Sequence, residues 1–381
     1  MKIKAAVLRE YKKPVSIETL DLEAPQANEV LVKYVHTGFC NSDLHMMEGA
    51  FGPVPLPLVI GHEVAGIVEK VGPGVQNVKK GDRVIVTWLV SCGECPECLR
   101  GKSNICRRAF YPSLQGTLPS GGLRMKDKNG APVRYQTFVS GFATHQVVDA
   151  RSLIHVHDEM PLDQACLMGC CVPTGWGAVT NKANVQPGDS VVVYGAGGVG
   201  LNVIRAAACR QANPIIVVDL EGSKEKIARE FGATHFINSS EEDPVPKIMK
   251  LTGGVLMDDG TFMGGGGDAV FEVIGNSGAY VQAFWSLGMS GKLVAVGIIP
   301  YDETFALPQT FLTFHDKSVL GSLYGSISTH LDIPRYSELA VRGDMMLDKL
   351  VTNHFKLEDI NEVADAMRKR EIQGRWVCDL D

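Results

Sequence analysis

Short apolar segments separated by turn residues dominate the first 150 residues. Val and Ile recur in 29–35, 63–71 and 83–88, and Gly-containing turns interrupt the chain at 72–74 and 81–82. No helical repeat of apolar positions connects these segments. The pattern predicts strands joined by tight turns, and it favours an antiparallel sheet or a partial barrel.

The pattern changes near residue 172, where apolar strands begin to alternate with helical stretches. The helices are expected to run up to residue 211 and over 222–231. The predicted strands are 190–194, 214–219, 235–238, 268–274 and 292–297. Regular alternation of strand and helix predicts an α/β fold with a parallel, doubly wound sheet.

The rest of the chain is less regular. A helix is expected over 357–370 and a strand over 375–379. Residues 252–267 are too rich in glycine for a helix and predict a loop or small hairpin. A surface insertion explains this segment more simply than a subunit contact does.

Charge and composition narrow the class of protein. The chain is 45% hydrophobic, carries a net charge of −6 and has no long run of like charges, which argues against nucleic-acid or membrane binding. Its first residues resemble no secretory signal. The longest apolar run, 191–209, contains four glycines and Arg205, so it does not read as a membrane span. We therefore expect a cytoplasmic protein.

A glycine-rich turn follows the first predicted strand of the second region. The sequence Gly195-Ala196-Gly197-Gly198-Val199-Gly200 fits G-x-G-x-x-G between a strand and a helix, the context in which this motif binds a dinucleotide. Asp219 ends the next strand, where an acid binds the ribose hydroxyls and disfavours a 2′-phosphate. The prediction is NAD rather than NADP, with Lys224 near the ribose; the alternative is that Asp219 only caps a helix.

Four of the ten cysteines are closely spaced, at Cys92, Cys95, Cys98 and Cys106. Four thiolates can close a tetrahedral shell, which predicts a structural Zn²⁺ that folds a lobe over 89–108. An iron–sulfur cluster fits the polar surroundings less well. A zinc module that binds nucleic acid or another protein is disfavoured because the chain is acidic overall and the lobe lies among the candidate enzyme motifs.

Other candidate ligands are scattered along the chain. Cys40, His62 and Cys170 would form a Cys₂His set with an open fourth position, the arrangement of a catalytic Zn²⁺. Each alone has a simpler explanation, since single cysteines and histidines are commonly part of a core. Only their combination favours a metal site.

These motifs together resemble the zinc-dependent medium-chain alcohol dehydrogenases, most closely those with a long catalytic-domain loop, the class III-like members. The similarity rests on GHE at 61–63, the four-cysteine lobe, GCCVPTGWG at 169–177 and GAGGVG at 195–200, in the family's order. It implies a Rossmann domain plus a β-rich GroES-like catalytic domain. The implied boundaries are 1–171 for the catalytic domain, 172–322 for the NAD-binding domain and 323–381 for the part that completes the catalytic domain.

The resemblance also implies roles at the zinc site. Cys40, His62 and Cys170 would bind the catalytic Zn²⁺, and Glu63 would be a neighbour able to reach the metal. Asp43 would orient His62. Cys171 stays open as an alternative to Cys170. The remaining cysteines, Cys166, Cys209 and Cys378, are expected to be ordinary buried thiols.

The implied reaction is reversible hydride transfer between an alcohol and NAD. Zinc would act as a Lewis acid that favours the alkoxide, and Ser42 and His45 would relay the released proton. His45 could instead be a surface residue without a role. The further cofactor contacts implied are Thr174, Val199, Ile298 and Arg375. Asn41 departs from the family, in which many members carry a basic residue that contacts the pyrophosphate.

The substrate expected is a primary, allylic or aromatic alcohol. Alignment by the lobe places Trp88 in the pocket wall, facing Ile298. Phe51 and Phe110 stand where glutathione-adduct formaldehyde dehydrogenases carry an acid and an arginine, which disfavours that substrate. The alternative is a polyol or thiol-adduct dehydrogenase on the same scaffold. The family also implies a homodimer or homotetramer.

Overall fold

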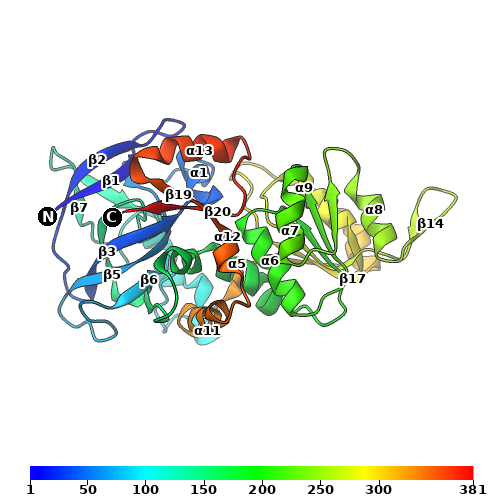
Figure 1. The fold of residues 1–381 in the computed structure, drawn as a ribbon, viewed down its shortest axis with the longest axis horizontal. Helices are drawn as coiled ribbons and strands as arrows, with labels where there is room; N and C mark the ends of the chain where they lie inside the picture. Colours follow the sequence, from blue (N-terminus) through cyan, green and yellow to red (C-terminus); the bar gives the residue numbers. More distant parts are fainter. Residues whose placement is uncertain (381) are drawn as a thin grey trace. The chain divides into compact units, whose positions relative to one another are not determined.

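The computed structural model describes residues 1–380, and the chain divides into two compact units. The first unit combines Met1–Pro173 with the C-terminal stretch that begins at Ile327, and the second is Thr174–Ser326. The expected boundaries, after residues 171 and 322, fall two and four residues earlier. Figure 1 shows the elements of each unit along the chain.

Unit 1 is built mainly from β-strands in two sheets. The order β1-β2-β7-β8-β4 closes a barrel, and the second sheet has the order β10-β6-β5-β3-β20-β19, with β9 also paired to β3. The strands are β1 (Lys2–Leu8), β2 (Ser16–Leu22), β3 (Glu29–Gly38), β4 (Leu58–Val59), β5 (Glu63–Val71), β6 (Arg83–Val86), β7 (Met125–Lys126), β8 (Pro132–Tyr135), β9 (His145–Asp149), β10 (Leu153–His155), β19 (Val351–Lys356) and β20 (Arg375–Asp379). The predicted β-rich character of this region is confirmed.

The first strand separates two hydrophobic cores. Ile3, Ala5 and Val7 face one core, whereas Ala6 and Leu8 face the other. Successive side chains of a strand point to opposite faces, so one apolar strand can serve both cores.

The C-terminal strands complete the sheet of unit 1. β20 pairs antiparallel with β3, with Asp379 opposite His36, and β19 pairs parallel with β20. The helices of unit 1 are α1 (Asn41–Glu48), α2 (Pro96–Leu99), α3 (Arg107–Leu114), α4 (Leu162–Ala165), α11 (Thr329–Val341), α12 (Leu347–Leu350) and α13 (Ile360–Arg368). The helix expected over 357–370 is therefore shorter and begins after a turn of 3₁₀ helix. α5 (Cys171–Gly177) spans the boundary between the units.

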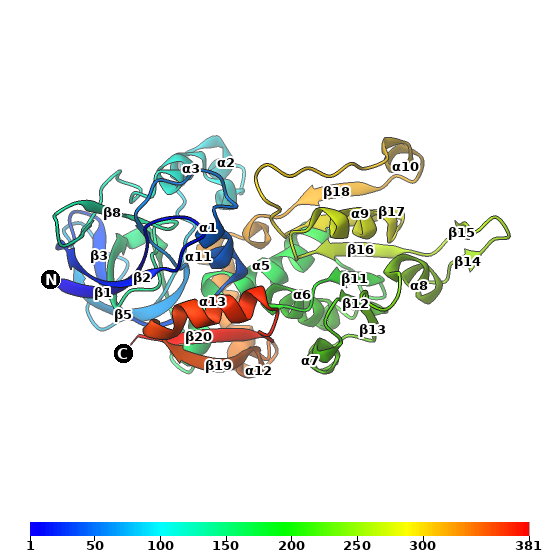
Figure 2. The same ribbon diagram turned by 90° about the horizontal axis from the view of Figure 1, so that it is seen from above.

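Unit 2 is a six-stranded parallel sheet with the order β13-β12-β11-β16-β17-β18, which Figure 2 shows from above. Its strands are β11 (Val191–Tyr194), β12 (Ile215–Asp219), β13 (His235–Asn238), β16 (Gly267–Glu272), β17 (Leu287–Ala295) and β18 (Ser318–Gly321). Its helices are α6 (Gly198–Cys209), α7 (Glu225–Phe231), α8 (Pro244–Leu251), α9 (Ser277–Trp285) and α10 (Gln309–Phe314).

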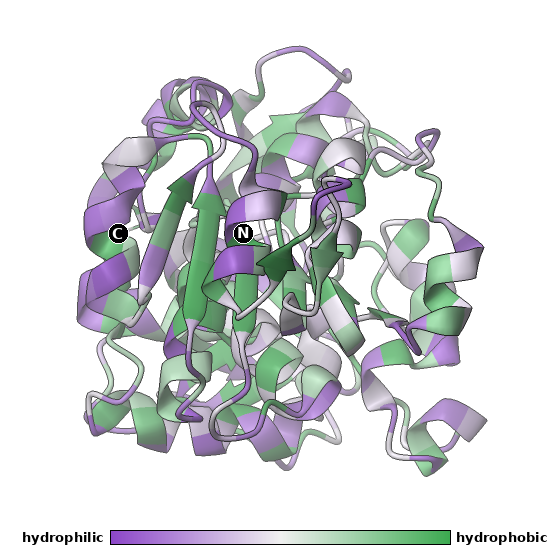
Figure 3. Ribbon diagram, turned by 90° about the vertical axis from the view of Figure 1, so that its right-hand side faces the viewer, coloured by the Kyte–Doolittle hydropathy of each residue, from purple (hydrophilic) through white to green (hydrophobic). Residues whose placement is uncertain are grey.

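Both faces of this sheet are covered. Val192 of β11 shares a core with Ile248 of α8 and Phe284 of α9, and Val191 and Val193, which point the other way, are buried as well. Strands buried on both faces read as continuous apolar runs, and the ribbons of Figure 3 are correspondingly green along the strands and mixed along the helices. The doubly wound α/β prediction is confirmed.

The glycine-rich segment between α8 and β16 forms a small hairpin, one of the two predicted structures. β14 (Val255–Leu256) pairs antiparallel with β15 (Phe262–Met263). Gly260 lies in the connecting turn with φ of 82°, a conformation that favours glycine. Figures 1 and 2 both show this hairpin projecting from unit 2.

The long apolar run 191–209 forms β11, the glycine turn and α6. Within residues 1–380, no helix combines the length and apolarity that crossing a membrane requires.

Candidate functional site

Cys40 lies in a buried turn between β3 and α1. Its backbone N–H donates to Oδ2 of Asp43 at 3.0 Å, and Oδ1 of the same carboxylate lies 2.8 Å from Nδ1 of His62. Gln136 donates from Nε2 to this Oδ1 at 3.0 Å. These contacts hold the buried Asp43 carboxylate in place. Asp43 in turn fixes the His62 ring, whose other nitrogen is left for another partner.

Four potential ligands meet beside this network. One ligand atom from each of Cys40, His62, Glu63 and Cys170 lies within 4.8 Å of the others, and all four residues are buried. They come from the turn after β3, the start of β5 and the turn before α5. The position before His62 is Gly61, with φ of 103°, and an added Cβ would lie 2.7 Å from the backbone nitrogen of Phe142. Only glycine fits at position 61, directly before the ligand His62.

The pKa values in this cluster reflect the mutual contacts. A hydrogen bond with the Cys170 thiol, aided by Arg375, lowers the pKa of Cys40 although burial opposes the shift. The same contact and burial raise the pKa of Cys170. Burial disfavours charge on His62, but its carboxylate partner and Cys40 outweigh burial and raise its pKa. Burial raises the pKa of Glu63 to about 8. The cluster thus gathers two sulfur atoms and one imidazole ring, which share their protons.

This donor set fits a zinc ion. Two sulfurs and one imidazole nitrogen are ligands that Zn²⁺ prefers, and the metal replaces the protons that the ligands otherwise share. Among residues 1–380, Oε2 of Glu63 and Nε of Arg375 are buried with no hydrogen-bond partner. A buried carboxylate oxygen without a partner requires an explanation, and a cation bound beside the two thiols would supply one.

Arg375 occupies a position that the sequence did not predict. It is the first residue of β20, it is buried, and its Nη2 lies 3.6 Å from Sγ of Cys40 and 3.4 Å from Oε1 of Glu63. Its predicted contact with the cofactor phosphate stays a prediction, and the structure shows its guanidinium group against the metal-ligand cluster of unit 1. Sequence reasoning also missed Gln136, because no spacing motif marks it.

The other cysteines can now be placed. Cys171 lies with its Sγ 3.8 Å from the carbonyl of Leu167 and is not a member of the four-ligand cluster. Cys166 and Cys378 are buried as expected. Cys209 is exposed, contrary to the expectation, because it is the last residue of α6.

The four lobe cysteines form a second cluster. One Sγ atom from each lies within 4.8 Å of the others, although only Cys95 and Cys106 are buried. The backbone N–H groups of Glu94 and Cys95 donate to Sγ of Cys92 at 3.4 and 3.3 Å. These donors lower the pKa of Cys92 to about 6. A thiolate oriented by backbone N–H groups is prepared to bind a metal.

The predicted proton-relay residues lie on α1. Nε2 of His45 lies 3.1 Å from Nδ2 of Asn41, one helical turn earlier, and its ring contacts Phe51 edge-on at 5.9 Å. Burial lowers the pKa of His45, against the attraction of Cys40. Within residues 1–380, no hydrogen bond joins Ser42 to His45 directly.

The predicted pocket residues of unit 1 differ in exposure. Phe51 and Trp88 are partly buried against the larger core of unit 1. Phe110 lies on α3 and is 64% exposed. The structure therefore places Phe110 on the surface of the lobe instead of in that core.

The glycine turn of unit 2 has the geometry that its motif requires. Gly195 has φ of 107°, and a Cβ on Gly200 would lie 1.9 Å from the carbonyl oxygen of Gly195. Around Gly197 there is open space at the start of α6, so a phosphate could approach the backbone. Gly198 and Val199 begin that helix. The turn fits a dinucleotide.

Asp219 ends β12 beside this turn. Its Oδ2 accepts from the backbone of Ala196 at 2.7 Å, and Nζ of Lys224 lies 3.3 Å from both carboxylate oxygens. Of the other predicted cofactor residues, Thr174 is buried on α5 and Ile298 is 46% exposed after β17.

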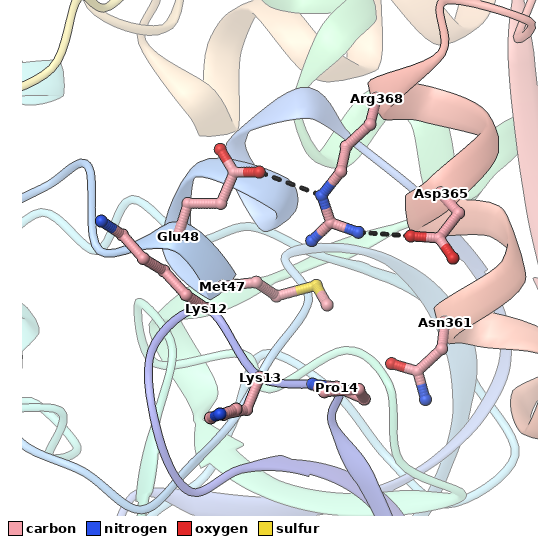
Figure 4. A pocket seen from close by; sticks show the side chains of 8 residues that line it. All are labelled: Lys12, Lys13, Pro14, Met47, Glu48, Asn361, Asp365 and Arg368. Atoms are coloured by element: carbon pink, nitrogen blue, oxygen red, sulfur yellow. Dashed lines mark hydrogen bonds and ion pairs between the residues drawn. The ribbon is translucent and has the colours of Figure 1, made fainter.

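A separate pocket of about 460 Å³ lies elsewhere in unit 1. Figure 4 shows Arg368 of α13 between Glu48 and Asp365, with Lys12 and Lys13 on a facing loop. None of the predicted site residues lines this pocket.

Comparison with known proteins agrees with both units. Residues 26–158 match the alcohol dehydrogenase GroES-like domain, and residues 198–342 match the zinc-binding dehydrogenase domain. The NDMA-dependent alcohol dehydrogenase of Amycolatopsis methanolica is 38% identical over 98% of both chains. An S-(hydroxymethyl)glutathione dehydrogenase of Escherichia coli is 36% identical over 97% of both chains.

A solved structure also resembles this chain over its full length. The benzyl alcohol dehydrogenase of Acinetobacter calcoaceticus superimposes with a TM-score of 0.91 at 32% identity, covering 100% of both chains. The chain therefore belongs to the zinc-dependent medium-chain alcohol dehydrogenases, a family of oxidoreductases that act on small alcohols and aldehydes.

Proposed function

We propose that this alcohol dehydrogenase oxidises a primary, allylic or aromatic alcohol with NAD, using a catalytic Zn²⁺ held by Cys40, His62 and Cys170. The observation that carries the proposal is the convergence of these three buried side chains beside Glu63. The chain also combines a β-rich unit that carries the ligands with a unit whose glycine turn fits a dinucleotide. This combination supports the same proposal.

When bound, zinc supplies Lewis-acid activation of the alcohol oxygen. The residues of this chain have separate tasks. Asp43 sets the tautomer and direction of His62, and Gln136 keeps Asp43 oriented. Arg375 faces Glu63 and Cys40, and it would balance the negative charge of metal-bound thiolates. Glu63 is the residue able to move toward the metal.

The lobe cysteines Cys92, Cys95, Cys98 and Cys106 would hold a second, structural Zn²⁺. Four sulfur ligands leave no position for a substrate. The lobe has a small core, formed by Val90, Ala109, Phe138 and the cysteines themselves. Such a core gains most of its stability from the ion.

The preference for NAD rests on Asp219. Its carboxylate is fixed next to the glycine turn, where it would accept from ribose hydroxyls and repel a 2′-phosphate. Gly195, Gly197, Gly198, Val199 and Gly200 would hold the pyrophosphate, with Thr174, Lys224 and Ile298 as further cofactor contacts. Replacing Asp219 by Gly together with Leu220→Arg should shift the ratio of kcat/KM for NAD and NADP toward NADP. A wild-type enzyme that already prefers NADP would contradict the assignment.

We propose that Ser42 and His45 carry the released proton out of the site through the ribose. His45 is suited to this task because burial lowers its pKa, so that the ring is uncharged near neutral pH. Asn41 donates toward Nε2 of the ring and orients it.

The substrate assignment is supported by apolar side chains. Phe51 and Trp88 contribute aromatic surface within unit 1, and the benzyl alcohol dehydrogenase resembles the chain over its full length. Phe110, exposed on the lobe, would lie at most at the pocket entrance.

A second candidate is oxidation of a thiol adduct of formaldehyde, favoured by 36% identity to an S-(hydroxymethyl)glutathione dehydrogenase. The deciding experiment follows NADH formation with benzyl alcohol, sorbitol, and formaldehyde plus glutathione in parallel. The proposal expects the highest kcat/KM with benzyl alcohol. A preference for the glutathione mixture would establish the second candidate, and a preference for sorbitol would indicate a polyol dehydrogenase.

We also propose a cytoplasmic homodimer or homotetramer. Two cysteine clusters with the geometry of metal ligands fit a reducing compartment better than an oxidising one. The edge strand β18 is largely exposed, and an open sheet edge is a template for pairing with another copy. Light scattering of the purified protein tests the oligomeric state.

A further inference from the structure

Three more potential ligands meet on neighbouring strands of unit 1, outside the site described above. They are His36 on β3, Asp379 on β20 and His354 on β19, and one ligand atom from each lies within 4.8 Å of the others. Asp379 is directly opposite His36 in the antiparallel pairing. Cross-strand partners share a face of the sheet, so the strand register itself brings this set together.

The two imidazoles point at the same oxygen atom. Nδ1 of His36 lies 2.9 Å and Nδ1 of His354 lies 2.8 Å from Oδ1 of Asp379. The two rings are nearly perpendicular, at 81°. The side chains are 22%, 41% and 44% exposed for His36, His354 and Asp379. An ion from solvent can therefore reach all three groups and keep water in its remaining positions.

A second carboxylate stands behind one of the imidazoles. Oδ2 of Asp163 lies 3.7 Å from Nε2 of His354, the nitrogen that does not face Asp379. Metal-binding histidines almost always direct their second nitrogen to a carboxylate, a carbonyl or water. At 3.7 Å the contact is electrostatic and not a hydrogen bond, but it places a carboxylate on the side of His354 that faces away from Asp379.

We propose that His36, His354 and Asp379 form an accessory site for a divalent transition-metal ion, with Zn²⁺ as the expected occupant. Two imidazoles and one carboxylate suit zinc and its neighbours, whereas calcium and magnesium require more oxygen ligands. The ion links β3 to both C-terminal strands. Because it binds only the folded arrangement, it stabilises the attachment of these strands to unit 1.

The test uses the full-length enzyme with its resident zinc. Total zinc per chain is counted at saturation, by equilibrium dialysis against increasing Zn²⁺, for the wild type, His354→Gln and Asp379→Asn. Each variant is expected to bind one ion fewer than the wild type. His155→Gln, which alters an exposed histidine outside the cluster, is the matched control and should bind as the wild type does. Asp163→Asn should weaken this binding by about 5-fold or less, because its contact with His354 is long and partly exposed.

Thermal unfolding supplies the second measurement. Added Zn²⁺ should raise the Tm of the wild type and of His155→Gln, but not that of the two ligand variants, whose metal-free Tm shows whether they fold. Because the measurement is a difference of one ion, it stands even if the assignments of the two cysteine clusters fail. Equal zinc counts in wild type and both ligand variants, or a zinc-induced Tm rise that both variants retain, would overturn the accessory site.

Discussion

The two cysteine clusters of unit 1 contain similar ligands but are built in opposite ways. Cys92, Cys95, Cys98 and Cys106 lie within one short loop, and their local core is small. Cys40, His62 and Cys170 come from distant segments that the main sheet and its large core hold together. On the proposed assignments, the lobe would depend on its ion for structure, whereas the fold itself positions the buried cluster, whose ion would be free to act in chemistry.

The largest effect should come from removing a ligand of the buried cluster. Cys40→Ala is expected to lower kcat/KM for alcohol oxidation by about 10³-fold or more, since Lewis-acid activation contributes several kcal/mol. The Tm should change little, because the sheet positions this cluster. Steady-state kinetics and thermal unfolding measure the two quantities.

Cys209→Ala is the matched control, because Cys209 is exposed on unit 2 and belongs to neither cluster. It should retain wild-type activity. An active Cys40→Ala enzyme would remove the basis for a catalytic role of the buried cluster.

Removing a ligand of the lobe should lower the stability of the protein much more than its activity. Cys95→Ala is expected to destabilise the protein by more than about 4 kcal/mol, the range typical of losing a bound metal. Denaturant unfolding and solubility measure this loss, and any remaining folded enzyme should keep much of its activity per folded molecule. Unchanged stability together with unchanged zinc content would show that the lobe holds no ion.

A third change tests how firmly the fold positions His62. Asp43→Asn keeps the size of the side chain but removes its charge, so zinc affinity or activity should fall about 10–100-fold. The fold should persist, since the single amide oxygen of Asn can still accept the hydrogen bond from the backbone of Cys40. Chelator competition measures the affinity. A variant with wild-type affinity and rate would mean that Asp43 does not orient the ligand.

The smallest effect is expected at the proton relay. Burial lowers the pKa of His45, so the ring stays uncharged from neutral pH down to below the ordinary pKa of histidine. Only at still lower pH does the ring become protonated and unable to accept a proton. His45→Gln should therefore slow oxidation most just below neutral pH, by about 10²-fold or less, because water partly replaces the relay. Imidazole buffer should restore part of the rate in the variant alone.

The pH profiles of both proteins are compared with a deuterated alcohol, so that slow product release does not hide the effect. Superimposable profiles under conditions where chemistry limits the rate would leave His45 without a role in proton transfer.

Much of the fold and of the two cysteine clusters can be predicted from the sequence, but some of their contacts cannot. The alternation of strands and helices after residue 172 predicts the parallel sheet because its strands are buried on both faces. The lobe is predictable because its ligands are close in sequence. The contact of Arg375 with Glu63 is not, since it depends on the pairing of β20 with β3 across most of the chain. Gln136 is likewise recognisable only once Asp43 is located in space.

The central claim is that one chain holds two zinc ions with different tasks, and zinc counting tests it most directly. The wild type, Cys40→Ala and Cys95→Ala are purified without chelator, dialysed against zinc-free buffer and analysed for tightly bound zinc per folded chain. We expect two ions in the wild type and one in each variant, with catalysis lost only in Cys40→Ala and stability lost only in Cys95→Ala. One ion or none in the wild type, or two ions retained in either variant, would contradict the account.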